Sequence, residues 1–244
     1  MRRKFELLMK DLWRALELPT KQDYPLTIAA WGARHFSHEL VADPLKVRQV
    51  LDFIRALRIS GVTGRRTAEE ALMESLIDLA SQCGGELGST NCPRPSGFDR
   101  TTDATAEQQP MLRVLQELHD FALACFQFKR PRDSFGGTRR GLAFEILGEV
   151  GGVVDLPQVV DMARKALKKS KSIESRHAAN FLHAYFSRRD GALDDAITAE
   201  LLSLAEAADS RSTAFSALNA LVETGTICEF EALDRMDEWK SKHY

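Results

Sequence analysis

The chain has 244 residues, which is enough for one large domain or two small ones with a substantial core. Hydrophobic residues make up 44% of it and charged residues 28%, a balance that excludes a wholly disordered chain, a collagen and a bundle of membrane helices. With 33 basic and 35 acidic side chains, the net charge of -2 gives no overall attraction to nucleic acid or to anionic lipid.

Four helices are predicted in the first third of the chain. The first is amphipathic and stops near Pro19, and the second starts at Tyr24-Pro25 and ends before Asp43-Pro44. Asp43 suits the N-cap of the third helix, and Thr67-Ala68-Glu69-Glu70 has the spacing of a capping box that opens the fourth, which is expected to end at Gly84-Gly85. The apolar residues at helical spacing are Phe5, Leu8, Leu12 and Leu16, then Ile28, Trp31 and Phe36, then Val47, Val50, Leu51, Ile54 and Leu57, then Leu72, Leu76 and Leu79.

The stretch from Gly84 to Pro110 is rich in Gly, Ser, Thr and Pro and has almost no apolar residue to bury. We predict a mobile linker there, because a loop of this length is uncommon inside a compact domain. The chain is therefore divided into a helical part over 1–83, a flexible loop over 84–110 and a second helical part over 111–244. One continuous helical array over both parts is the alternative. A strong helix from Met111 to Cys125 follows the loop.

An internal repeat marks the carboxyl-terminal half. Ala143-Phe144-Glu145-Ile146-Leu147, Ala178-Ala179-Asn180-Phe181-Leu182 and Ala214-Phe215-Ser216-Ala217-Leu218 align at offsets of 35 and 36 residues. A turn and a second apolar helix follow each copy. These second helices carry Val159, Val160, Ala163 and Leu167, then Ile197, Leu201, Leu204 and Ala205, then Phe230, Leu233 and Met236. Helical hairpins that recur at this length predict an all-α fold, an α-α superhelix (solenoid) of stacked hairpins whose small Ala residues let neighbouring helices approach.

Residues 139–151, Arg-Arg-Gly-Leu-Ala-Phe-Glu-Ile-Leu-Gly-Glu-Val-Gly, resemble the first helix of a HEAT-like repeat, which begins with Arg and Ala and ends in an aliphatic-Leu-Gly-x-aliphatic-Gly pattern. Residues 176–179 and 213–225 are similar, the latter without the internal Gly. The resemblance covers 139–244 and implies a HEAT/ARM-like solenoid there. HEAT-like proteins include scaffolds, bilin lyases, a di-iron hydroxylase and DNA glycosylases, so the resemblance implies a curved binding surface but no particular reaction.

Charge alternates along the chain in four blocks. Residues 1–66 carry 13 basic and 7 acidic side chains, residues 67–128 carry 3 and 10, residues 129–189 carry 13 and 6, and residues 190–244 carry 4 and 12. After folding, such blocks either form surface patches that suit a charged partner or neutralise one another across internal packing. The sequence leaves both interpretations open.

We expect the chain to act in protein recognition, as a scaffold or adaptor whose stacked hairpins present a preformed groove to a partner helix or peptide. The alternating charge blocks would then supply specificity. Trp13, Trp31 and Trp239 are candidate contact anchors, and burial in the core is the competing interpretation for each.

The alternative function is binding of nucleic acid, as in the HEAT-like DNA glycosylases. Basic side chains of the third charge block gather at helix ends and turns of adjacent repeats, where stacking would line them up to neutralise phosphates. The competing interpretation is that they complement helix dipoles or pair with carboxylates of the neighbouring repeat. The candidate binding residues are Arg139, Arg140, Arg164, Lys168, Lys169 and Arg176.

No catalytic residue, metal site or cofactor is predicted. The di-iron hydroxylase of the HEAT-like set uses several His-Glu dipeptides, whereas this chain has one, His38-Glu39. His35 and His38 share a helix face without a further ligand, and His177 and His183, six residues apart, lie on different faces. Residues 136–141, Gly-Gly-Thr-Arg-Arg-Gly, lack the Gly-Lys-Ser/Thr ending of a P-loop, and the chain has no Gly-x-Ser-x-Gly motif.

The cysteines and the amino terminus indicate the compartment. The four cysteines include no Cys-x-x-Cys pair, so neither a disulfide framework nor a zinc ribbon is predicted. Buried free thiols are expected, with a contact between Cys83 and Cys92 as the alternative. Residues 1–6 open a charged amphipathic pattern rather than a secretory signal, and no apolar run approaches membrane-spanning length. We therefore expect a cytoplasmic protein without a membrane partner.

Overall fold

The computed structural model describes residues 5–17, 37–60, 64–88, 105–128, 135–188 and 193–243, and the regular elements within them are all α-helices. In chain order they are α1 (Phe5–Glu17), α3 (Ser37–Leu40), α4 (Pro44–Ile59), α5 (Arg65–Gly88), α6 (Gln109–Gln127), α7 (Gly136–Val150), α8 (Pro157–Leu167), α9 (Ile173–Ser187), α10 (Asp195–Ala207), α11 (Arg211–Glu223) and α12 (Glu229–His243). The all-α prediction is confirmed for this part of the chain. The predicted helix from Tyr24-Pro25 lies outside the described residues as far as Phe36, and so do the predictions for Trp31, His35, Cys92 and the side chain of His38.

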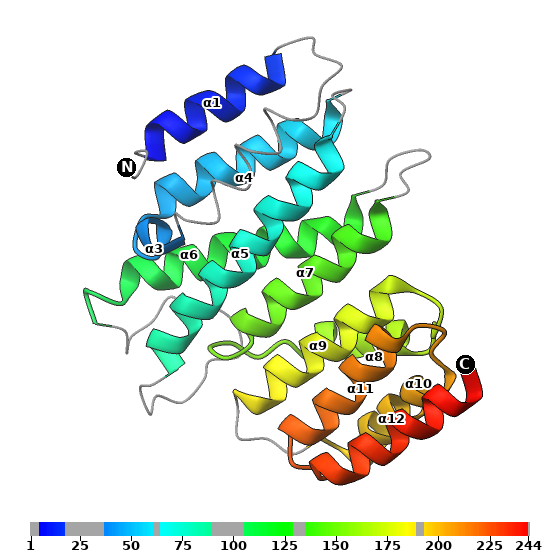
Figure 1. Cartoon of the computed structure of the whole chain (residues 1–244). Helices are drawn as coiled ribbons and strands as arrows, with labels where there is room; N and C mark the ends of the chain where they lie inside the picture. Colours follow the sequence, from blue (N-terminus) through cyan, green and yellow to red (C-terminus); the bar gives the residue numbers. More distant parts are fainter. Residues whose placement is uncertain are drawn as a thin grey trace.

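Four helices form a row in which each packs on the next (Figure 1). α5 packs on α7, α7 on α9 and α9 on α11, and the contact between α7 and α9 is the most extensive. The other helices cover this row: α6 contacts α4, α5 and α7, α8 contacts α9 and α10, and both α10 and α12 contact α11. α1 packs on α4 at the opposite end from α12. From α7 onward the chain therefore alternates between the row and the helices that cover it.

Small residues set the spacing within the row. The alanines that open the three aligned segments are fully buried: Ala143, Ala178 and Ala214. Glycines of α7 face the next helix, so that a Cβ atom on Gly141 would lie 2.2 Å from the ring of His177, and one on Gly148 would lie 3.0 Å from the Cβ atom of Ala184. Side chains at these two positions would force α7 and α9 apart.

The helix starts carry the caps that their residue types favour. Asp43 caps α4 as predicted, because its side chain accepts a hydrogen bond of 3.1 Å from the backbone N–H of Lys46, and Pro44 takes the first helical position. In the repeat region Ser172, Asp194 and Ser210 cap α9, α10 and α11 in the same way.

The boundaries of α5 differ from the prediction. The helix begins at Arg65, directly after Gly64 with its φ of 77°, so the capping box predicted at Thr67 is wrong. It then continues through Gly84 and Gly85 to Gly88, and α6 begins at Gln109, so both ends of the segment predicted as a loop over 84–110 are helical. The prediction of a mobile linker over 89–104 lies outside the described residues. Leu87 is 8% exposed, so an apolar contact beyond the two glycines holds the last turn of α5 in the core.

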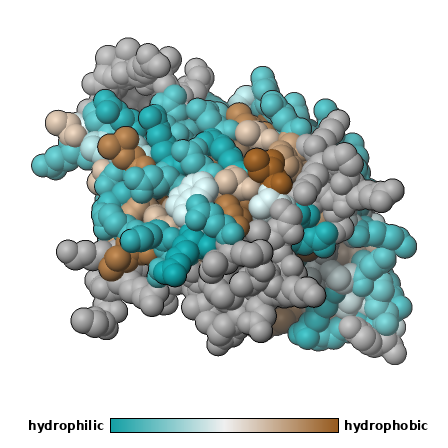
Figure 2. Space-filling model, turned by 90° about the horizontal axis from the view of Figure 1, so that it is seen from above, coloured by the Kyte–Doolittle hydropathy of each residue, from teal (hydrophilic) through white to brown (hydrophobic). Residues whose placement is uncertain are grey.

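Three apolar residues predicted in the core of the last repeat are exposed: Phe215, Phe230 and Leu233 are 60%, 80% and 62% accessible. Phe215 takes the repeat position of Phe144, which is enclosed by Phe126 of α6 and Phe181 of α9. Phe215 instead lies exposed on α11, and helical periodicity alone does not reveal which apolar positions another helix will cover. Separate hydrophobic patches also interrupt the mainly hydrophilic surface seen from above (Figure 2).

We expect Gly141→Ala to lower the free energy of unfolding by about 1 to 3 kcal/mol, because the added methyl group overlaps the ring of His177. Gly85→Ala on α5 is the matched control. No atom lies within 4 Å of its added Cβ, and the change from a helical glycine raises the free energy of unfolding by up to about 1 kcal/mol. Urea unfolding followed by circular dichroism measures both variants, and equal effects would contradict the close approach of α7 and α9.

Candidate functional site

Arg139, predicted as a surface binding residue, is only 3% exposed and belongs to a buried ionic cluster. Nε of Arg58 and Nε of Arg139 each donate a hydrogen bond of 2.6 Å to Oε1 of Glu69, and Nη2 of Arg139 donates to Oε2 at 3.0 Å. Glu69 is 2% exposed. One carboxylate therefore joins α4, α5 and α7, and Arg139 is part of the core rather than of a surface stripe.

Aromatic rings and a thiol enclose the two guanidinium groups. The guanidinium carbon of Arg58 lies 4.7 Å from the ring centroid of Phe121, and that of Arg139 lies 4.6 Å from the centroid of Phe128. Nη2 of Arg58 lies 3.0 Å from Sγ of Cys125, and burial raises the pKa of this thiol despite the guanidinium. Two arginines can be buried here because each stacks on an aromatic ring and donates to a carboxylate. We therefore give the cluster a structural role.

Glu69→Gln is expected to lower the free energy of unfolding by about 3 to 5 kcal/mol, because it leaves two buried guanidinium groups without their anion. Glu238→Gln makes the same change at an exposed position of α12 and is expected to alter stability by less than about 0.5 kcal/mol. Chemical denaturation of both variants measures the difference. A loss below about 1 kcal/mol for Glu69→Gln would show that the cluster is not needed for stability.

Three other candidate binding residues face carboxylates of neighbouring helices. Arg140 donates to both oxygens of Glu174 at 3.2 and 3.1 Å. Arg164 of α8 donates to both oxygens of Glu200 of α10 at 2.9 and 3.2 Å, and Nζ of Lys168 lies 3.7 Å from the same carboxylate. These three residues therefore pair with carboxylates of neighbouring helices, as the competing interpretation of the basic block predicted.

The last two candidates have different surroundings. Lys169 is exposed, and Nη2 of the half-buried Arg176 lies 3.2 Å from Nε2 of His177. The structure thus brings Arg164 and Lys168 together around one carboxylate, but it does not place all six candidates on one surface, because Arg139 is buried between α5 and α7.

Ion pairs also join the charge blocks that alternate along the sequence. The pairs that link a basic block to an acidic one include Arg48–Glu117, Arg58–Glu69, Arg139–Glu69, Arg164–Glu200, Lys168–Glu200 and Lys171–Asp209. Neutralisation across internal packing, one of the two interpretations left open by the sequence, therefore accounts for much of the alternation.

A pocket of 430 Å³ opens on the row where α5, α7 and α9 meet. Its volume lies within the range of small ligand sites. Glu145 and Glu149 enter it from α7, because residues four positions apart share one helix face. The residues that line the pocket are Ile77, Glu145, Glu149, Asn180, His183, Ala184, Ser187 and Arg188.

Glu145 is held by two donors of α9. Nδ1 of His177 and Nδ2 of Asn180 each lie 2.6 Å from its Oε1. Burial acts to raise the pKa of Glu145, but the hydrogen bonds from His177 and Asn180 and the attraction of His177 and Arg176 outweigh it, so the pKa is lowered. The carboxylate is therefore ionised at neutral pH. Within the described residues both hydrogen bonds end on Oε1, which leaves Oε2 available to a further donor.

Glu149 is held differently. Its Oε2 is sealed from solvent and contacts the guanidinium of Arg188 without hydrogen-bond geometry, while Nη2 of Arg188 donates to Oγ of Ser81 at 3.0 Å. Burial raises the pKa of Glu149, and the charges of Glu145 and Asp78 raise it further, against the opposing effects of Arg188 and Ser81. Two carboxylates on one face of α7 thus have pKa values displaced in opposite directions.

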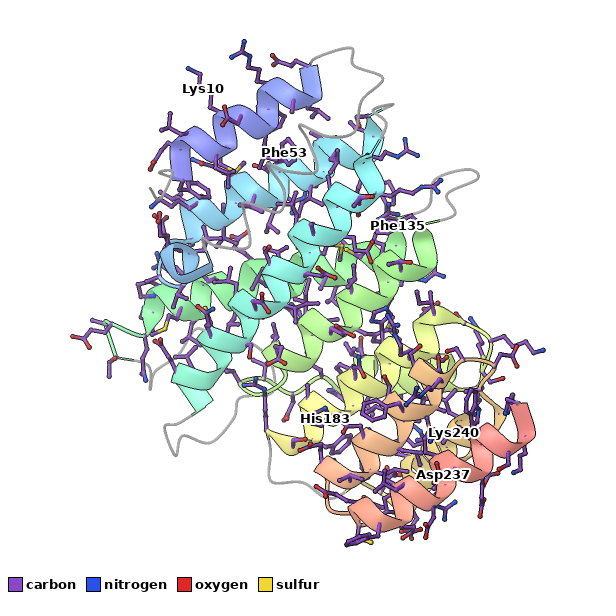
Figure 3. The ribbon with its side chains drawn as sticks, viewed as in Figure 1. Lys10, Phe53, Phe135, His183, Asp237 and Lys240 are labelled. Atoms are coloured by element: carbon purple, nitrogen blue, oxygen red, sulfur yellow. The ribbon has the colours of Figure 1, made fainter. Side chains whose placement is uncertain are left out.

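His183 of α9 completes the polar lining and is labelled in Figure 3. Burial lowers its pKa, and the guanidinium of Arg188 lowers it further, whereas the carboxylate of Glu223 in α11 opposes both effects. The imidazole is therefore neutral at pH 7 and offers one donor and one acceptor nitrogen.

We expect the His183 ring to titrate below pH 6.5 in the folded chain, and Glu223→Gln to lower the midpoint further because it removes the carboxylate that favours the imidazolium. Since the unfolded chain then binds this proton more readily, the contribution of His183 to stability is complete above pH 6.5 and declines as the pH falls through 6.5. Imidazole proton shifts in NMR spectra measure the midpoint, with Glu238→Gln as control. A midpoint at or above 6.5, or a rise in Glu223→Gln, would contradict this environment.

Of the remaining aromatic and thiol candidates that the structure describes, Trp239, Cys83 and Cys125 are buried, whereas Trp13 and Cys228 are exposed, so the prediction of buried thiols is wrong for Cys228. Trp13 is 38% exposed and packs edge-on against Phe53 with ring centroids 5.2 Å apart. Trp239 is 4% exposed and its Nε1 donates to the backbone oxygen of Ala208 at 2.8 Å, so it is not a surface anchor. Burial raises the pKa of the free thiol Cys83 to about 12, which makes it unreactive at neutral pH.

The pocket was not predicted from the sequence, although the sequence contains one signal for it. The aligned positions Glu145, Asn180 and Ser216 are polar inside otherwise apolar segments. A polar residue repeated at one position of buried helices indicates a face of the row that is not covered by apolar packing. Apolar periodicity does not reveal this signal, because it depends on the apolar positions alone.

No group of three or more His, Cys, Asp or Glu side chains in the described ranges is placed to hold a metal ion. Among the helices that the structure describes, none combines the length and apolar character needed to cross a membrane. Comparison of the chain with protein-family models, with curated proteins and with solved structures found no match. The function is therefore argued from the pocket and its surroundings.

Proposed function

We propose that the chain is a polypeptide-binding module built as a HEAT-like solenoid, with its partner lying along the row of α5, α7, α9 and α11. The alternation of helices between the row and its cover from α7 onward supports this proposal. So do the aligned alanines buried at equivalent positions. In solenoids, equivalent helices of successive repeats form an extended preformed surface that binds without large rearrangement. The free thiols of the buried Cys83 and Cys125 and of the exposed Cys228 fit a reducing compartment, and we propose a cytoplasmic location.

The pocket at the junction of α5, α7 and α9 is the observation that carries the proposal. It combines the ionised carboxylate of Glu145, the neutral imidazole of His183 and the apolar side chain of Ile77. Such a mixture suits recognition of a partner's side chain. Asp78 and Glu223 lie close enough to act on the titration of Glu149 and His183. With Glu145 and Glu149 they give four carboxylates around the pocket, against the two guanidinium groups of Arg176 and Arg188. A segment with positive charge complements this surface.

The nucleic-acid alternative has less support. Arg139, Arg140, Arg164 and Lys168, four of the six candidate phosphate-binding residues, already contact carboxylates. The pocket places further carboxylates on the row, where they would repel phosphates. We therefore propose a polypeptide partner and treat duplex binding as an outcome of the experiment.

Panning a library of displayed random peptides against the immobilised full chain tests the proposal. Ser187→Trp fills the pocket, and we expect it to weaken the selected peptides at least about tenfold in a fluorescence anisotropy titration. Ser203→Trp introduces the same ring at an exposed serine of α10 and is expected to leave the affinity unchanged.

Equal peptide affinity in Ser187→Trp and the unmodified chain would show that the partner lies elsewhere. A library without binders, together with salt-dependent affinity for a DNA duplex, would replace the proposal by the nucleic-acid alternative.

A further inference from the structure

We propose that the pocket binds the ε-ammonium group of a lysine side chain from the partner. This assignment rests on the proposed polypeptide-binding function and names the side chain that the pocket selects. Its basis is the set of acceptors that remain once the contacts within the protein are made.

The pocket offers oxygen and nitrogen acceptors from two helices. Oε1 of Glu145 accepts from His177 and Asn180, which leaves Oε2 for a ligand. Asn180 uses its amide N–H on that carboxylate, so its carbonyl oxygen remains as an acceptor. The neutral ring of His183 has one acceptor nitrogen. An ammonium group carries three N–H donors, which matches this set.

Charge favours a cation in the pocket. Two carboxylates and one guanidinium line it, and the neutral His183 adds no charge. The guanidinium of Arg188 is held at the wall by Glu149 and by Ser81, so it does not serve as a counter-ion for an anionic ligand. Asp78 and Glu223 add negative charge nearby, and Arg176 adds one positive charge close to Glu145. A bound ammonium group would meet attraction from each of these carboxylates.

The apolar part of the wall suits a lysine stem. Ile77 of α5 and Ala184 of α9 line the same pocket as the polar groups. Lysine side chains commonly lay their methylene groups along apolar surface while the charged end reaches polar partners. The volume of 430 Å³ has room for such a chain and part of the backbone that carries it.

The carboxylate geometry favours lysine over arginine. Oε1 of Glu145 is occupied by its two donors, and Oε2 of Glu149 is covered by Arg188. Each carboxylate therefore presents at most one oxygen to a ligand. A guanidinium group binds most strongly when it donates to both oxygens of one carboxylate. An ammonium group acts as a point charge and needs only one oxygen from each carboxylate.

The experiment titrates n-butylammonium, which has the length of a lysine side chain, into the isotope-labelled full chain. The side-chain amide of Asn180 and the ring of His183 are followed by NMR. We expect saturable shifts at both groups, weaker binding of n-butylguanidinium and none of N-butylacetamide, which lacks the charge. Glu145→Gln should weaken n-butylammonium about tenfold or more, since a charged hydrogen bond is lost.

Glu238→Gln on α12 is the matched control and should leave binding unchanged. Because Glu145 also positions His177, Ser187→Trp serves as a second variant that fills the pocket and keeps both carboxylates. Absence of saturable shifts, equal binding in Glu145→Gln, or n-butylguanidinium that binds as well as n-butylammonium would overturn the assignment.

The assignment and the proposed function fail in different ways. If peptides are selected but n-butylammonium does not bind, the ammonium site is wrong and polypeptide binding stands. If n-butylammonium binds at the pocket but no peptide is selected, the ammonium chemistry stands and the polypeptide partner is wrong.

Discussion

Glu69 brings one carboxylate to two guanidinium groups in the core and thereby joins α4, α5 and α7. An uncompensated buried charge costs about 3 to 5 kcal/mol, which is a large part of the total stability of an ordinary domain. The aromatic rings that face Arg58 and Arg139 lower this cost without removing it. The start of the helical row is therefore fixed by a polar contact as much as by apolar burial.

Polar groups also lie in the contact between α7 and α9, the next two helices of the row. α7 and α9 approach closely at Gly141, and the polar groups caught between them, Glu145, His177 and Asn180, satisfy one another. A pocket opens beside these groups. Among the described residues, Oε2 of Glu145 and the neutral imidazole of His183 remain available to a ligand there. The carboxylate that links α9 to α7 is thus the same one to which we assign the ammonium group of the ligand. Glu145 therefore has both a structural role between two helices and the proposed binding role.

The all-α class and many of the helices were predictable from the sequence, whereas the site was not. Apolar periodicity and Asp43-Pro44 identified helices because these signals are local, and the repeated alanines identified faces that pack. The exposure of Phe215 and the pairing of Arg139 with Glu69 each depend on which helix packs beside the residue. Local sequence patterns do not contain this information. An arginine at a helix start looks the same in a sequence whether it faces solvent or Glu69. Its apparent place in a basic block favoured the surface, and the structure places it in the core.

Exchange of the arginine Nε–H protons, measured by NMR in the intact chain, tests the central role of Glu69 most directly. The account predicts slow exchange for the Nε–H groups of Arg58 and Arg139, because both donate to a buried carboxylate, and fast exchange for Arg55, whose side chain is 52% exposed. In Glu69→Gln both slow signals should lose their protection. Exchange of Arg58 and Arg139 as fast as that of Arg55 in the unmodified chain would contradict the buried cluster and the packing of α4, α5 and α7 that depends on it.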